Sequence, residues 1–134
     1  MSKPINTQLG IISGRDAIHL DEQKDVTSRY GMTFMGEIAG DLCSNNYTNK
    51  EWIPYILSFD CPIYFVGYEL DLYPNVSYLK SSFCLIKESD LLTSILEKDL
   101  QGKFDKQNFR HFVLATYDYV YEIIACDFKL EIVS

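Results

Sequence analysis

The chain has 134 residues, 47% of them hydrophobic and 14% aromatic, which is the composition of one folded domain and excludes a disordered polar segment. Its formal net charge is −7 and its pI about 4.7, so the average surface field opposes direct binding of nucleic acid and favours a basic protein partner. The N-terminus has no signal-peptide pattern, and no apolar run reaches the roughly 18 residues of a membrane span, so we expect a single domain over residues 1–134, in the cytoplasm and without membrane contact.

The N-terminal third predicts two short strands and a helix. Residues 9–13 suit a short strand closed by a turn, and residues 21–31 suit a short helix with an aspartate at its N-cap. Residues 32–42 fit both strand alternation and helical spacing. We favour a strand there because Gly36 and Gly40 would each weaken a helix by about 1 kcal/mol.

The middle of the chain predicts two more strand runs between residues 55 and 72. They are separated at residues 60–62, where Pro62 cannot donate a hydrogen bond to a central ladder. A hairpin or one long bulged strand fits this pattern. Residues 82–87 then predict a short apolar strand.

A helix over residues 90–101 has the clearest local signals. Ser89 is a good N-cap, Asp90 suits the positive N-terminal end, and Gly102 suits the first position after the helix. An apolar stripe at helical spacing predicts that this helix lies on the sheet; it consists of Leu91, Leu92, Ile95, Leu96 and Leu100.

The C-terminal residues 109–133 predict a hairpin whose second arm is long, bulged or bent. Its last part alternates strictly, with Phe128, Leu130 and Ile132 on one face. Mostly antiparallel strands with a late helix define an α+β domain, for which we expect about five to seven strands and one or two helices packed on one sheet face.

Candidate catalytic groups are few, because the chain contains only two histidines. His111 shares strand parity with its apolar neighbours, and such a residue more often packs or hydrogen-bonds locally than catalyses. A dyad of His111 with Cys84 or Cys126 is the catalytic alternative, although no nucleophile signature surrounds either cysteine. No carboxylate pair can be selected for acid–base work, and no phosphate-binding loop motif occurs.

Metal binding and disulfide formation are both weakly signalled. Four carboxylates and one imidazole that could hold a divalent cation lie near the N-terminus, namely Asp16, His19, Asp21, Glu22 and Asp25. They lack the spacing of a calcium-binding loop. Such a cluster is more commonly a solvated acidic face. The four cysteines form no CxxC pair and are expected to be buried thiols; they are Cys43, Cys61, Cys84 and Cys126.

Tyrosines interleaved with acidic residues offer a surface for a basic partner. Tyrosines on a sheet mostly pack, but tyrosine is also enriched at interface hot spots, where neighbouring carboxylates can pair with lysine or arginine. The partner-binding residues predicted on this basis are Glu69, Asp71, Tyr73, Asp118 and Glu122.

The segments HFVLATYDYVYEIIACDFKLEI and SSFCLIKESDLLTSIL resemble a pattern of small bacterial orphan families, in which a strand, a capped helix and a closing hairpin end a domain of this size. Some of these families are immunity proteins that neutralise secreted or contact-delivered toxins. The resemblance covers the last half of the chain and implies a cognate toxin partner, no cofactor and no catalysis, and it transfers no residue role.

We therefore expect an acidic immunity protein that binds a basic toxin domain, such as a nuclease, and occludes its active site. The alternative is a small-ligand-binding protein or an enzyme with a pocket on the sheet near His111.

Overall fold

The computed structural model describes residues 2–24, 31–74 and 79–133, and these residues form nine strands, one α-helix and three 3₁₀ turns. The predicted α+β class with mostly antiparallel sheet is confirmed. The strands are β1 (Ser2–Pro4), β2 (Ile18–Lys24), β3 (Met32–Ala39), β4 (Trp52–Asp60), β5 (Tyr64–Glu69), β6 (Phe83–Ile86), β7 (Arg110–Ala115), β8 (Tyr119–Ala125) and β9 (Asp127–Ile132). The helix α1 is Asp90–Leu96, and the 3₁₀ turns are Gly40–Leu42, Leu70–Leu72 and Lys106–Asn108.

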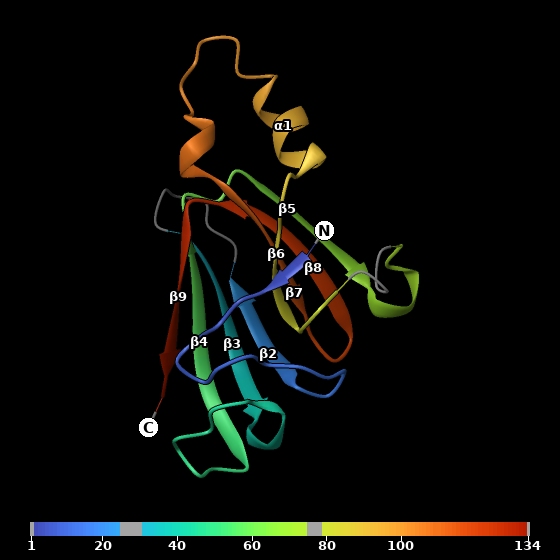
Figure 1. The fold of residues 1–134 in the computed structure, drawn as a ribbon, viewed down its shortest axis with the longest axis vertical. Helices are drawn as coiled ribbons and strands as arrows, with labels where there is room; N and C mark the ends of the chain where they lie inside the picture. The colour runs from blue at the N-terminus through green and yellow to red at the C-terminus, as the bar shows by residue number, and fades with distance from the viewer. Residues whose placement is uncertain (1, 25–30, 75–78, 134) are drawn as a thin grey trace.

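The strands form two antiparallel sheets instead of the single sheet of five to seven strands that we expected. The five-stranded sheet has the order β1-β6-β7-β8-β5, and the four-stranded sheet has the order β2-β3-β4-β9. Figure 1 shows α1 at one end of the molecule, past the ends of the strands, with β9 and the C-terminus on the side of β4.

The main core lies between the inner faces of the two sheets, where aromatic rings from both sheets meet. Phe59 of β4 lies 5.1 Å from Phe112 of β7, and Phe34 of β3 lies 5.2 Å from Tyr121 of β8, measured between ring centroids. Phe34, Phe59 and Phe112 are fully buried. Burying each such side chain stabilises the fold by about 1.5 to 3 kcal/mol. Because side chains alternate along a strand, each strand places its apolar residues on the inner face, where the two sheets pack.

The predicted helix over residues 21–31 is wrong, because residues 18–24 form strand β2. This strand pairs antiparallel with β3, with Ile18 opposite Ile38 and Lys24 opposite Thr33. It is the edge strand of its sheet and exposes polar side chains, so it carries little of the apolar alternation by which strands are recognised. Residues 25–30 lie outside the described part of the chain.

The break predicted at residues 60–62 is confirmed, but the two runs form neither a hairpin nor one long strand. β4 belongs to the four-stranded sheet and β5 to the five-stranded sheet. The chain also changes sheet between β1 and β2, and it does so a third time at Cys126, between β8 and β9. There the Cys126 N–H donates to the Asp60 carbonyl oxygen at 2.8 Å. Periodicity shows which residues of a strand are buried but not which sheet the strand joins.

The helix α1 begins as predicted and ends earlier. The Ser89 hydroxyl oxygen accepts the Leu92 N–H at 3.0 Å, which is the expected N-cap. The helix ends at Leu96, Gly102 has the left-handed φ of +66°, and Leu100 is 94% exposed, so the predicted stripe stops one turn short. Leu92 packs with Phe109 and Ile124, so α1 contacts the outer face of the five-stranded sheet only at the end of its strands. None of the helices formed by the described residues is long and apolar enough to span a membrane.

Candidate functional site

A hydrogen-bonded chain of Ser89, His111 and Glu122 lies on the outer face of the five-stranded sheet. Val113 pairs with Glu122 across β7 and β8, so His111 and Glu122 are diagonal neighbours on one face. The His111 Nδ1 lies 2.7 Å from the Ser89 hydroxyl, and its Nε2 lies 2.7 Å from Glu122 Oε1. Three elements, α1, β7 and β8, are joined by this chain.

The donors in this chain can be assigned from its chemistry. An ionised carboxylate only accepts hydrogen bonds, so His111 Nε2–H is the donor to ionised Glu122. The Ser89 hydroxyl is the partner of Nδ1, and its oxygen also accepts the Leu92 N–H. Ser89 is 8% exposed and His111 is 4% exposed, so the chain is a buried network in which each of these groups has a partner.

Serine, histidine and a carboxylate in this order also occur in nucleophilic hydrolases. Here the Ser89 oxygen is held at the N-cap by the Leu92 N–H, and the hydroxyl lies within hydrogen-bond distance of His111. The arrangement fixes the start of α1 to the sheet and holds the Glu122 carboxylate at one position.

The Glu122 carboxylate and His111 open onto a cleft of about 440 Å³ on this face of the sheet, which we call the His111 cleft. This volume is in the range of small-ligand sites. The Glu122 side chain is 12% exposed, so its charge is only slightly accessible to solvent. Three tyrosines and three aliphatic residues contribute to the lining, namely Tyr64, Tyr68, Tyr73, Leu79, Ile86 and Leu91.

Two tyrosines of the His111 cleft, Tyr64 and Tyr73, have raised pKa values. Burial raises the pKa of Tyr73 well above its usual value, and the charges of Glu122 and Tyr68 raise it further. Burial also raises the pKa of Tyr64, with contributions from Tyr68 and Glu122. These hydroxyls therefore stay protonated near neutral pH, and the negative charge of the cleft lies on carboxylates.

A second, smaller hollow of about 280 Å³ lies between β2 and the turn that joins β7 to β8, and we call it the acidic groove. Asp21 and Glu22 line it from β2, and Asp118 lines it from the turn. All three are exposed. The sheets bring these carboxylates together although Asp118 is far from the other two in the sequence, because the Tyr117 N–H donates to the Ile18 carbonyl oxygen at 2.9 Å.

Exposed aromatic side chains surround the acidic groove. The His19 ring stacks on Tyr117 at 5.3 Å and meets the edge of Trp52 at 5.0 Å. Trp52, Tyr117 and Tyr119 are 42%, 43% and 46% exposed, respectively. Large aromatic side chains that are nearly half exposed beside carboxylates are typical of protein-binding surfaces.

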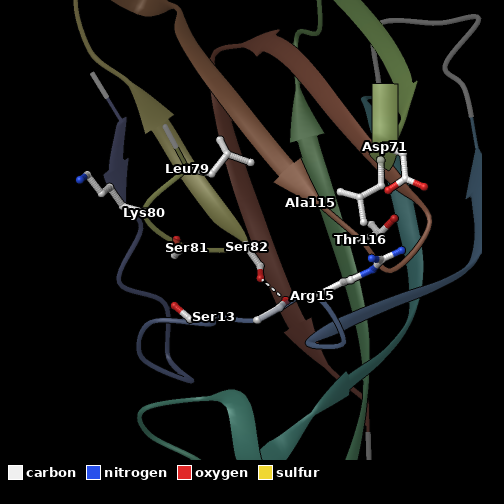
Figure 2. Close-up of a pocket in the computed structure, with 11 residues that line it drawn as sticks. Ser13, Arg15, Asp71, Leu79, Lys80, Ser81, Ser82, Ala115 and Thr116 are labelled. Carbon is white, nitrogen blue, oxygen red and sulfur yellow. Dashed lines mark hydrogen bonds between the residues drawn. The ribbon is translucent and has the colours of Figure 1, made fainter. Parts of the chain in front are cut away.

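The third hollow, of about 490 Å³, is the one drawn in Figure 2. The Ser82 hydroxyl donates to the Gly14 carbonyl oxygen at 2.8 Å, and this bond joins the N-terminal loop to the segment before β6. Arg15, Lys80 and Asp71 contribute charges of both signs to the lining. A mixed lining of this kind selects no single class of ligand.

The structure distributes the five predicted partner-binding residues over different places. Tyr73 and Glu122 share the His111 cleft, Asp118 lines the acidic groove, and Asp71 lines the hollow of Figure 2. The exposed Glu69 carboxylate accepts the Asp71 N–H at 2.9 Å and caps the Leu70–Leu72 turn. Asp118 also lies next to this turn, because the Leu70 N–H donates to the Asp118 carbonyl oxygen at 2.9 Å, so the predicted residues form two groups, Tyr73 with Glu122 and Glu69 with Asp71 and Asp118.

Sequence reasoning missed the partnership of Ser89 with His111. A hairpin centred on residues 117 and 118 pairs His111 with Ile124, which places Glu122 diagonally next to His111. The proximity of His111 and Glu122 could therefore have been predicted from the hairpin. The position of Ser89 depends on how α1 docks on the sheet, which no local pattern encodes.

The residues considered for a metal do not form a cation site in the described part of the chain, which contains no cluster of three or more histidine, cysteine or acidic side chains suited to a metal. His19 Nε2 instead lies 3.1 Å from the Asp16 carbonyl oxygen. Asp25 lies outside the described residues.

The four cysteines are free thiols, as expected, but only Cys84 is fully buried. Cys43 and Cys126 are partly buried, and Cys61 is exposed. Burial, together with a hydrogen bond from the Cys126 thiol to Cys61, raises the pKa of Cys126 to about 11.

Fold and sites define an antiparallel two-sheet α+β protein with a histidine–carboxylate cleft on one sheet and a separate acidic groove edged by aromatic residues. Comparison of the chain with protein-family models, curated proteins and solved structures gave no match. Its function has to be inferred from these sites.

Proposed function

We propose that this chain is an acidic immunity protein of the bacterial cytoplasm that binds a basic toxin domain, such as a nuclease, and blocks it by covering its active site. The observation that carries the proposal is the acidic groove, where Asp21, Glu22 and Asp118 converge beside three exposed aromatic rings. The protein acts by binding, and no catalytic step is assigned to it.

The chemistry of the groove matches a basic partner. Aromatic rings supply large contact area at low entropic cost, and tyrosine and tryptophan are the commonest interface hot spots. Trp52 and Tyr117 are therefore the expected anchors, and the carboxylates are the expected partners for lysine and arginine. β2 is also the edge strand of its sheet, which offers backbone groups for contact with another chain.

The net charge of −7 supports the same partner class. A field of one sign steers an oppositely charged protein toward the groove and speeds association at low salt. Because exposed charges are screened over about 8 Å at physiological ionic strength, association should slow as salt is added. A nuclease domain, which binds phosphate backbones through lysine and arginine, has the complementary charge.

The test is capture of partners from the native host with three tagged proteins. The first is the natural chain, and the second is the groove variant Asp21→Asn, Glu22→Gln, Asp118→Asn. The third is a control variant with the same change of net charge at exposed sites away from the groove, Asp41→Asn, Glu88→Gln, Glu97→Gln. Captured proteins are identified by mass spectrometry at low and high salt.

A basic protein captured by the natural chain at low salt and depleted at high salt supports the proposal. The groove variant should then bind it about tenfold more weakly, because three interfacial charge pairs are removed, whereas the control variant should bind nearly as the natural chain does. Equal weakening in both variants would show that net charge alone attracts the partner and would contradict the groove.

A second candidate function is small-ligand binding in the His111 cleft, with or without catalysis. The observation that favours it is a cleft of ligand size with the Glu122 carboxylate beside His111. Ligand screening by thermal shift tests it independently of any protein partner.

A further inference from the structure

We propose that the His111 cleft binds an organic ammonium group carried on an apolar stem, either a free alkylamine or a lysine side chain. This binding site goes beyond the proposed function, because it lies on the outer face of the five-stranded sheet, and the acidic groove lies elsewhere, against β2.

The first argument is the charge at the floor of the cleft. Glu122 Oε1 accepts a hydrogen bond from His111 at 2.7 Å, and the contacts of the described residues include no hydrogen bond to Glu122 Oε2. Among the described residues no buried side-chain oxygen lacks a hydrogen-bond partner, so Oε2 lies open to the cleft, where it can accept a hydrogen bond from a ligand. An ammonium group would supply both the donor and the opposite charge.

The second argument is the sign of the other charged groups around the cleft. Its lining includes one further carboxylate, Asp90, and among the described residues neither lysine nor arginine lines it. An anionic ligand would therefore meet two carboxylates, and His111, which could compensate them, is already engaged with Glu122. The field selects a cation.

The third argument is the aromatic wall. Tyr64, Tyr68 and Tyr73 line the cleft, and the Tyr68 and Tyr73 rings meet at 5.3 Å and an angle of 60°, so they present differently oriented surfaces. Electron-rich ring faces attract ammonium ions, and several tyrosines around a carboxylate form the setting in which organic ammonium groups are recognised. The raised pKa of Tyr73 keeps its ring a neutral phenol.

The fourth argument concerns the part of the ligand behind the charge. Leu79, Ile86 and Leu91 supply an aliphatic side to the cleft, which suits methylene groups and excludes a fully hydrated metal ion. A volume of about 440 Å³ exceeds what an ammonium group alone would fill, so a stem of several carbons is expected.

The experiment is a titration of the natural chain with n-butylammonium, followed by the chemical shifts of backbone amides and compared with n-butanol as the neutral isostere. We expect saturable shifts at residues of the cleft, including His111 and Glu122, with n-butylammonium and at least tenfold weaker binding of n-butanol. Equal binding of both probes, or no saturable binding of n-butylammonium, would overturn the proposal.

Two variants test the residues. Glu122→Gln keeps an acceptor for His111 and removes the charge, and it should weaken n-butylammonium at least tenfold without changing the binding of n-butanol. Tyr68→Leu should weaken n-butylammonium severalfold, as expected for loss of one cation–π contact, whereas Tyr68→Phe should have little effect. If Glu122→Gln unfolds the protein, the comparison of Tyr68→Leu with Tyr68→Phe still tests the proposal. Equal affinities of these two variants for n-butylammonium would contradict the role of the aromatic ring.

The source of the ammonium group is decided by a further probe. This is a short peptide whose two ends are blocked by acetylation and amidation and which carries one lysine with a free side-chain ammonium group. Tighter binding of the peptide than of n-butylammonium identifies a lysine side chain as the ligand, and weaker binding identifies a free amine. Loss of partner capture by the groove variant leaves these titrations unchanged, so the two proposals fail separately.

Discussion

Replacing Ser89 with alanine should destabilise the protein more than the loss of a helix cap alone. The Ser89 hydroxyl oxygen accepts the Leu92 N–H at 3.0 Å, and removing an N-cap costs about 1 kcal/mol. The same hydroxyl is the partner of His111 Nδ1 at 2.7 Å, in a side chain that is 4% exposed. Leaving this buried nitrogen without a hydrogen-bond partner adds about 1 to 3 kcal/mol.

The expected total is a loss of about 2 to 4 kcal/mol in the free energy of unfolding, or roughly 10 °C in Tm for a chain of this length. Urea unfolding followed by far-UV circular dichroism measures it. Ser94→Ala is the matched control, because Ser94 is an exposed position of the same helix and should change stability by less than about 0.5 kcal/mol. A loss below about 1 kcal/mol for Ser89→Ala would refute the buried chain of hydrogen bonds.

Three further predictions address the core, the sheet and a thiol. Phe59→Ala should lower the free energy of unfolding by about 3 to 5 kcal/mol in urea titrations, whereas Leu100→Ala should leave it nearly unchanged, since Phe59 is fully buried and Leu100 is 94% exposed. Gly36→Ala should lower Tm strongly, because a Cβ there would lie 2.0 Å from the His19 carbonyl oxygen; an unchanged Tm would contradict the close approach of β2 and β3. The raised pKa of about 11 reduces the thiolate fraction of Cys126 near pH 8.5, so iodoacetamide should modify Cys126 about tenfold more slowly than an unperturbed thiol. The rate should keep rising up to about pH 11, and a plateau near pH 9 would contradict the raised pKa.

Local signals in the sequence were sufficient for several elements. The N-cap at Ser89, the strand over residues 32–39 and the alternation through Phe128 and Leu130 all follow from short-range stereochemistry or from burial of one face, and the structure confirms them. The diagonal placement of His111 and Glu122 also follows from the hairpin register. Such features can be predicted because they depend on neighbours along the chain or across one turn.

Features set by distant contacts were not predictable from the pattern. The strand at residues 18–24 carries polar side chains because it is an edge, and its pairing with β3 overrides its weak local preference. The division into two sheets is fixed where the chain crosses near Pro62 and Cys126, and neither position marks a change of sheet by its residue type. The same holds for the acidic groove, because Asp118 meets Asp21 only through packing of the two sheets.

The most direct test of the central claim is an inhibition titration of the captured basic partner with the natural chain, the groove variant and the control variant. The account predicts that the natural chain and the control variant inhibit the partner with nearly the same inhibition constant, and that the inhibition constant of the groove variant is about tenfold higher. Full activity of the partner in the presence of saturating natural chain would contradict the account.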